Sequence, residues 1–99
     1  IMLIKIHKSY RYLVAIWDND LLGKNFEEGK RVLEIKNGFF GGDEVEESEL
    51  IELMKNFKED DATFNIAGEK SIKAALKAGI ISREGIMKIQ GVPFALVLL

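Results

Sequence analysis

The apolar residues of this chain come in short runs, and the spacing inside each run decides what the chain can fold into. Residues 2–8 and 11–18 are rich in Ile, Val and aromatic residues and are separated only by Ser9-Tyr10. This pattern is typical of a β-hairpin. The second run is apolar on both of its alternating faces, which predicts an interior strand that is covered on two sides.

Three further runs also predict strands. Residues 31–36 alternate between apolar and polar as a half-buried strand does, whereas residues 24–30 look like a loop with Phe26 as their anchor. Residues 86–90 and 94–99 lie on either side of a Gly-Val-Pro turn, so we expect a second hairpin near the C-terminal end. Residues 94–99 are apolar without interruption and therefore need cover on both faces.

Two segments carry a helical period instead. Residues 44–57 place apolar side chains every three to four positions, and Asp43 with Glu46 predicts an N-cap and capping box at the start. Residues 68–78 form a second helix that ends at Gly79, a residue suited to a left-handed terminator. Residues 62–66 between the helices fit either a strand or the start of the second helix.

The resulting order of elements is β-β-β-α-(β)-α-β-β. Grouped hairpins with two helices, and no regular alternation of strand and helix, favour the α+β class. We therefore predict one domain over residues 1–99, built from a mixed, mainly antiparallel sheet of 5–6 strands with two main helices on one side.

Composition excludes several kinds of site. The chain has 99 residues, no Cys and one His, so a disulfide framework, a Cys-ligated metal, a thiol nucleophile and a multi-His metal site are all ruled out. His7, the single histidine, has no Ser or carboxylate nearby in the sequence with which to form a triad. We expect no metal and no cofactor, and the residues favour a non-catalytic role over an enzyme.

The sequence also predicts where the protein works. The longest apolar run, Val92 to Leu99, is far shorter than the ~20 residues that a membrane helix needs, and the N-terminal end has no signal-peptide layout. We therefore expect a cytoplasmic protein that does not enter membranes. The excess of Lys over Arg, with few Gln, is weakly typical of a heat-adapted source.

Charge is spread unevenly along the chain. The net charge is −2, but residues 37–61 carry nine acidic and two basic residues, whereas residues 62–99 carry five basic and two acidic. Overall acidity disfavours RNA as a partner, because binding phosphates needs a concentrated basic face. A protein partner suits the acidic block better.

Three glycine-containing stretches are candidate binding segments. Gly23-Lys24 resembles the end of a phosphate loop but lacks the earlier glycine and the following Ser or Thr, so Lys24 is more typical of a turn. Phe39 and Phe40, followed by two glycines, could stack on a nucleic acid or contact a protein, or could fill the core below their loop. The acidic residues that follow them favour a protein.

The stretch Asn65 to Glu69 is the third candidate. Small residues before a helix leave backbone N–H groups that can hold an anion, and Lys70 in the first turn could assist. Asn65, Gly68 and Lys70 are therefore candidate ligand-binding residues. Helix capping and close packing are the competing interpretation, and Glu69 already complements the helix dipole.

Several motifs recur in an order that resembles a known family. They are Leu21-Leu22-Gly23-Lys24, Phe39-Phe40-Gly41-Gly42, Asn65-Ile66-Ala67-Gly68-Glu69, Ala74 to Ile81, and Ile89-Gln90-Gly91-Val92-Pro93. In this order and spacing the chain resembles the archaeal uncharacterised family called domain of unknown function 424. The resemblance implies a compact cytoplasmic archaeal protein and supplies no reaction. In that family the segment after Val-Pro commonly continues His-Ala-Gln, whereas this chain has Phe94-Ala95-Leu96.

Two hypotheses about function follow. The first is a non-catalytic binding or adaptor module with a protein partner, in a translation- or RNA-associated setting. The second is a small anionic-ligand-binding or enzymatic domain, with its site at the Asn65–Glu69 turn or at a dimer interface. Residues 94–99 either form a central strand of the sheet or take part in a homo-oligomer, which is compatible with both hypotheses.

Overall fold

The computed structural model describes residues 2–8, 10–34 and 42–98. The first two strands, β1 (Met2–Lys8) and β2 (Tyr12–Asp18), form the predicted antiparallel hairpin, in which Met2 pairs with Asp18 and Lys8 with Tyr12. Phe39 and Phe40 lie outside the described residues, so the prediction for their loop stays a prediction.

The main sheet has six strands in the order β5-β1-β2-β6-β8-β7. The additional strands are β5 (Asp43–Val45), β6 (Thr63–Ala67), β7 (Met87–Ile89) and β8 (Val92–Val97). Among these described strands only β2 and β6 run parallel, and every other pair is antiparallel. The predicted α+β class with a mixed, mainly antiparallel sheet is confirmed.

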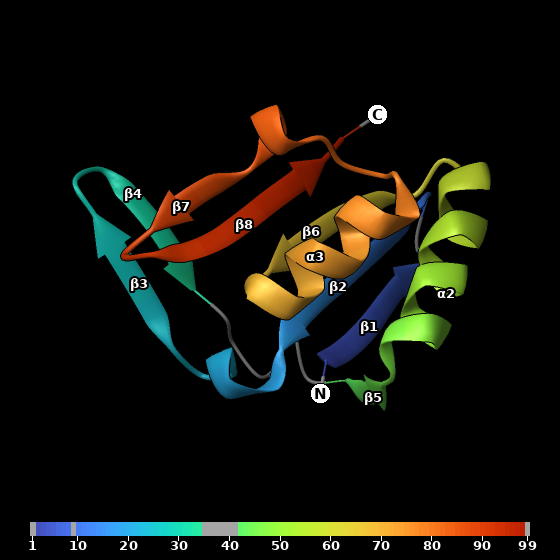
Figure 1. The fold of residues 1–99 in the computed structure, drawn as a ribbon, viewed down its shortest axis with the longest axis horizontal. Helices are drawn as coiled ribbons and strands as arrows, with labels where there is room; N and C mark the ends of the chain where they lie inside the picture. Colours follow the sequence, from blue (N-terminus) through green and yellow to red (C-terminus); the bar gives the residue numbers. More distant parts are fainter. Residues whose placement is uncertain (1, 9, 35–41, 99) are drawn as a thin grey trace.

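Two helices, α2 (Glu47–Glu59) and α3 (Glu69–Ala78), cover one face of the sheet (Figure 1). Between the helices and the sheet lies the larger hydrophobic core, where Val14, Ile16, Leu50, Met54 and Phe64 are almost completely inaccessible to solvent. Close packing of such side chains is the main stabilising contribution in a domain of this size. Within the described ranges, no helix is both long enough and apolar enough to cross a bilayer.

The opposite face of the sheet carries a second, smaller core. Its buried members are Leu3, Ala15, Trp17, Leu21 and Ala67, with Leu22, Phe26, Val92 and Phe94 packed against them. Phe26 belongs to a separate two-stranded sheet of β3 (Asn25–Glu28) and β4 (Arg31–Glu34), which lies near β7 (Figure 1). Strand β2 is thus buried on both faces, as its sequence predicted.

Some sequence predictions were wrong in detail. Asp43 does not cap a helix: it begins strand β5, and α2 begins at Glu47 with Glu46 as an N-cap that makes no side-chain capping bond. Pairing with β1, where Leu3 lies opposite Glu44, outweighs the local capping signal. Residues 24–30 are not a plain loop, because Asn25–Glu28 pair with β4 to form β3.

Other predictions were confirmed or resolved. Residues 62–66 largely form strand β6, which lies next to β2 and β8. The second helix ends at Gly79, which adopts the left-handed conformation with φ 75°. Of the two alternatives for the C-terminal run, the structure supports the central strand, since β8 is hydrogen-bonded on both sides, to β6 and to β7.

Candidate functional site

The parallel pair β2 and β6 brings two chain segments together at one edge of the sheet. Strand β2 ends at Asp18 and continues into the short 3-10 helix η1 (Asn19–Leu21), while β6 ends at Ala67 and continues into α3. The register pairs Trp17 with Ala67, so the two strands end side by side. The edge at the carboxyl ends of parallel strands is a common place for ligands in proteins that contain such strands.

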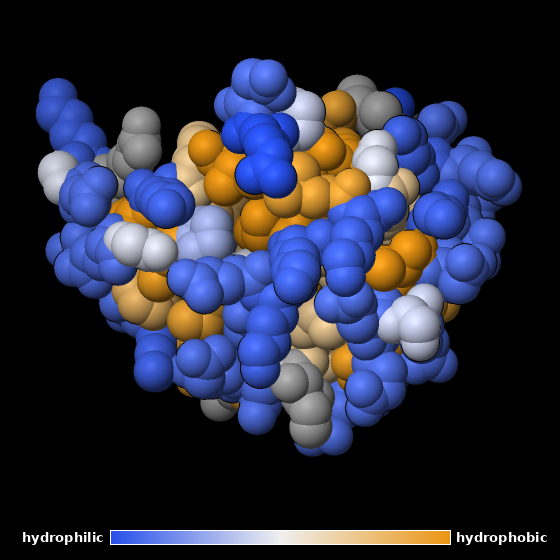
Figure 2. Space-filling view, viewed as in Figure 1, coloured by the Kyte–Doolittle hydropathy of each residue, from blue (hydrophilic) through white to orange (hydrophobic). Residues whose placement is uncertain are grey.

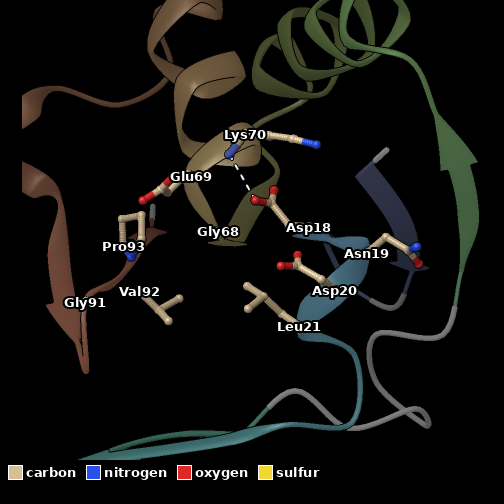
Figure 3. Close-up of a pocket in the computed structure, with 10 residues that line it drawn as sticks. All are labelled: Asp18, Asn19, Asp20, Leu21, Gly68, Glu69, Lys70, Gly91, Val92 and Pro93. Carbon is tan, nitrogen blue, oxygen red and sulfur yellow. Dashed lines mark hydrogen bonds between the residues drawn. The ribbon is translucent and has the colours of Figure 1, made fainter.

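Asp18 is the central side chain of this edge. Its carboxylate accepts hydrogen bonds from the backbone N–H of Lys70 at 3.0 Å (Figure 3), from the backbone N–H of Ser71 at 2.8 Å and from the Ser71 hydroxyl at 2.8 Å. The residue is 7% exposed, and Ser71 is fully buried. The carboxylate of Asp18, at the end of β2, therefore provides the negative charge that the N-terminus of α3 favours.

Gly68 allows this close approach. A Cβ atom at position 68 would lie 2.4 Å from the Cγ of Asp18, far inside van der Waals contact, and the φ of +106° is one that other residues rarely adopt. The Gly68 backbone N–H also donates a 2.9 Å hydrogen bond to the Pro93 carbonyl, which ties the start of α3 to strand β8. Three strands, β2, β6 and β8, are thereby joined at one point.

A pocket of about 590 Å³ opens beside this joint. Three segments line it: Asp18 to Leu21 at the end of β2, Gly68 to Lys70 after β6, and Gly91 to Pro93 at the start of β8. Figure 3 shows the side chains of Leu21 and Val92 facing each other across the pocket. The pocket therefore combines aliphatic walls with a polar rim.

The rim is predominantly acidic. Asp18, Asp20 and Glu69 contribute carboxylates to the lining, and Lys70 contributes the one cation among the lining residues. In Figure 3 the Asp20 carboxylate points into the space between η1 and β8, whereas the Lys70 side chain extends to the other side of Asp18, away from Val92. The field inside the pocket consequently favours a positively charged group.

The sequence of this chain is similar to that of other proteins. A family model described as "Protein of unknown function (DUF424)" matches residues 7–99. The chain belongs to this DUF424 family. No curated protein matches the chain.

A solved structure has the same fold. It is the crystal structure of an uncharacterized conserved protein from Methanopyrus kandleri, with a TM-score of 0.86 and 24% sequence identity, and the alignment covers 97% of this chain and 89% of that one. At this identity the likeness shows the fold alone. The resemblance to the DUF424 family that the glycine motifs predicted is confirmed.

The structure brings together only some of the residues that the sequence singled out. Gly68 and Lys70 both line the pocket. Asn65 lies on β6 three residues before Gly68, half-buried on the face of the sheet that carries the smaller core, where it pairs with Ala15 and Leu96. Lys24 is exposed beyond η1 and donates its backbone N–H to the Leu21 carbonyl at 3.0 Å.

The hydrogen bonds at the start of α3 weaken the hypothesis that an anion binds at the Asn65–Glu69 turn. The N–H groups of Lys70 and Ser71, which an external anion would use, already donate to Asp18. This role of Asp18 was not predicted from the sequence, where Asp18 is only the last residue of the run 11–18. The available signal was a carboxylate directly after a buried strand, but nothing local indicated which helix it would meet.

In this DUF424 chain, Phe94 occupies the position at which the resemblance predicts a histidine. Phe94 lies on β8 and packs, half-buried, against the smaller core, with Ala67 and Met87 as its strand partners. Its side chain lies on the face of the sheet opposite α3. It directly follows Pro93, which lines the pocket. In this chain the position therefore contributes packing of an aromatic ring.

Proposed function

We propose that this protein is a non-catalytic binding or adaptor module, and that its pocket takes a basic side chain of a protein partner. The observation that carries the proposal is the combination of the acidic rim at Asp20 and Glu69 with the aliphatic walls at Leu21 and Val92. A Lys or Arg side chain has a matching construction, since its apolar stem can pack between aliphatic groups while its charged end meets carboxylates.

The hydrogen bonding and exposure of the side chains that could take part in a reaction support binding over catalysis. The Asp18 carboxylate and the Ser71 hydroxyl are hydrogen-bonded to each other and hold the start of α3. Asp20 and Glu69 are exposed at the pocket rim, where their carboxylates are accessible to a partner. These two side chains can therefore select a partner by its charge.

A translation- or RNA-associated assembly is the setting that we propose. Proteins of such assemblies commonly carry Lys- and Arg-rich tails that contact nucleic acid. An acidic pocket can capture such a tail, and it does not itself need to touch RNA. This setting agrees with an overall negative charge of −2.

The test is a titration of the full chain with a short Lys- and Arg-rich peptide and with a Glu-rich peptide of equal length. We expect only the basic peptide to bind, with an affinity that falls as salt rises. Asp20→Asn combined with Glu69→Gln should weaken binding by about tenfold or more. Glu59→Gln combined with Glu49→Gln on α2 is the matched control, since it removes the same charge away from the pocket and should leave the affinity unchanged.

The same assay separates this proposal from binding of a small anion. Phosphate and nucleotides are tested against the full chain and against Lys70→Ala, because Lys70 is the lining residue that could hold an anion. An anion that binds the native chain, and loses affinity in Lys70→Ala but not in Asp20→Asn, would overturn the cationic-partner proposal. Equal loss of peptide binding in the α2 control would overturn it as well.

A further inference from the structure

The helices leave part of the sheet less deeply covered. Helix α3 packs mainly against β2, β6 and β8. Four aliphatic side chains at the edge of the larger core are consequently only half-buried, and we call them the β8 strip: Leu76, Ile81, Ile86 and Val97. Figure 2 shows an apolar patch on this side of the molecule, between α3 and β7.

Leu76 of α3 lies, half-buried, at the edge of the larger core. Lys77 forms an ion pair with Glu47 of α2 at 2.7 Å, so Lys77 lies on the α2 side of the helix. Leu76 is about 100° away around the axis, so it does not point in the direction of Lys77. Val97 reaches the same face, because its strand partner Phe64 belongs to the larger core.

The surroundings of the strip are mainly basic. Lys73 on α3, Arg83 on the 3-10 helix η2 (Arg83–Gly85) and Lys88 on β7 are all exposed, and the Lys58 ammonium donates to the Gly79 carbonyl at 3.2 Å, just before Ile80 and Ile81. Glu84 on η2 and Glu69 on α3 are the acids of those two elements, and Lys73 also acts on Glu47 of α2, whose pKa it lowers. The Glu84 carboxylate is held by its own backbone N–H and by Ser82, which lower its pKa.

We propose that the β8 strip is a docking site for an acidic amphipathic helix of a partner protein. The aliphatic side chains of the strip would lose their remaining contact with water against the apolar face of such a helix, which contributes about 25 cal/mol per Å². Glu and Asp residues beside that face would meet Lys73, Arg83 and Lys88. Apolar anchors at positions i, i+3, i+4 and i+7 are the usual way in which a helix occupies such a surface.

Charge and chemistry favour this occupant over two others. A second copy of the chain would bring the same three cations to a two-fold interface, where they would repel each other. A single-stranded RNA would meet the cations but would find only aliphatic side chains in the strip, whereas such RNA sites stack bases on aromatic rings.

This inference goes beyond the proposed function, because it uses a different surface and the opposite charge. The pocket attracts a cationic group, and the β8 strip attracts an acidic helix. Together the two surfaces would let one small domain hold two partners of opposite charge. Their failures are distinguishable, since the pocket variants Asp20→Asn and Glu69→Gln change no residue of the strip.

The test uses the full chain and a labelled peptide of about 14 residues, which makes about four helical turns. The peptide has Leu at helical spacing on one face and Glu on the other. One control peptide has the same composition in shuffled order, and another has Lys in place of Glu. We expect the acidic amphipathic peptide to bind at least about tenfold more tightly than either control, measured by fluorescence anisotropy.

Variants then locate the binding. Leu76→Asp and Ile86→Asp should each weaken binding by about tenfold or more, whereas Leu53→Asp, the same type of change at a half-buried position on α2, should not. Lys73→Gln with Arg83→Gln should reduce both the affinity and its salt dependence, and Lys55→Gln on α2 is the control. This charge variant leaves the core untouched, so it still decides the matter if Leu76→Asp fails to fold by circular dichroism.

Four outcomes would overturn the inference. Equal binding of the shuffled peptide would show that the strip does not recognise an apolar helical face. Equal binding of the Lys-containing peptide would show that it does not recognise negative charge. Displacement of the peptide by oligouridylate, together with RNA binding that Lys73→Gln with Arg83→Gln abolishes, would assign the surface to RNA. Self-association in light scattering that Leu76→Asp abolishes would assign it to a second copy.

Discussion

The two ends of helix α3 are held in different ways. At the N-terminal end, the Asp18 carboxylate from strand β2 accepts hydrogen bonds from Lys70 and Ser71 in a buried setting. At the C-terminal end, Gly79 ends the helix by its own left-handed conformation, and Lys58 and the Lys77–Glu47 pair contact it at the surface. One end thus depends on a residue 52 positions away in the chain, and the other mainly on local conformation.

Of the two ends, the N-terminal end of α3 couples the fold to the candidate site. The N-terminal joint lines the pocket, so any change there alters both stability and the shape of the pocket. The C-terminal end lies away from the pocket and can be altered with little effect on it.

Removing the carboxylate should have the largest effect. Asp18→Ala leaves the N–H groups of Lys70 and Ser71 without their acceptor in a buried place, and we expect the free energy of unfolding to fall by about 3–5 kcal/mol. Asp18→Asn keeps one acceptor oxygen and should lose less. Urea denaturation followed by circular dichroism measures both, with the exposed Asp20→Asn as a control that should change by less than about 0.5 kcal/mol. A fall no larger than that of the control would contradict the structural role of Asp18.

Adding a methyl group at position 68 should come next. Gly68→Ala would place its Cβ 2.4 Å from the Cγ of Asp18 in a backbone conformation that is nearly exclusive to glycine. We expect a loss on the order of 3 kcal/mol.

A double-mutant cycle sharpens this prediction. In an Asp18→Ala background the steric clash disappears and only the backbone strain remains, so Gly68→Ala should cost clearly less there than in the native chain. Additive losses in the double variant would mean that Gly68 and Asp18 do not interact as the geometry indicates.

The C-terminal end should tolerate the same substitution better. A Cβ at Gly79 would meet no atom within 4 Å, so the cost comes from the left-handed backbone alone, with φ +75°. We expect Gly79→Ala to lower the free energy of unfolding by about 1 kcal/mol. A thermal melt of Gly79→Ala beside Gly68→Ala tests the comparison directly, and equal shifts in Tm would remove the distinction between the two ends.

The ion pair at this end should have the smallest effect. The hydrogen bond and the charge of Lys77, with a further contribution from Lys73, lower the pKa of Glu47 from its ordinary value of 4.5. A lowered carboxyl pKa in the folded state stabilises the fold above the unfolded value and is lost as the pH falls through the folded value. The small difference in stability between the native chain and Glu47→Gln, seen at pH 7, should therefore shrink as the pH falls below 4.5 and vanish once the pH is below the lowered pKa of Glu47. Persistence of that difference below the lowered pKa would mean that it does not come from the Glu47 charge.

Elements were predictable where their signals are local. The alternation of apolar residues in residues 2–8 and 11–18 indicated the first hairpin, and Gly79 indicated the end of α3, because each depends on nearby residues only. Asp43 was misread because a strand partner, β1, is supplied from the other end of the chain. The same holds for β3, whose pairing with β4 no single segment reveals.

The sequence alone indicates the class of the fold and the end of α3 at Gly79, since periodicity and glycine conformation act within a few residues. It also determined the unequal distribution of charge along the chain. Only the tertiary structure decided that β2 and β6 run parallel and end together, and hence that Asp18 reaches the start of α3 and the pocket forms beside it. The reason is physical: contacts between residues far apart in the chain depend on which strands pair, and strand pairing is a property of the whole packed sheet.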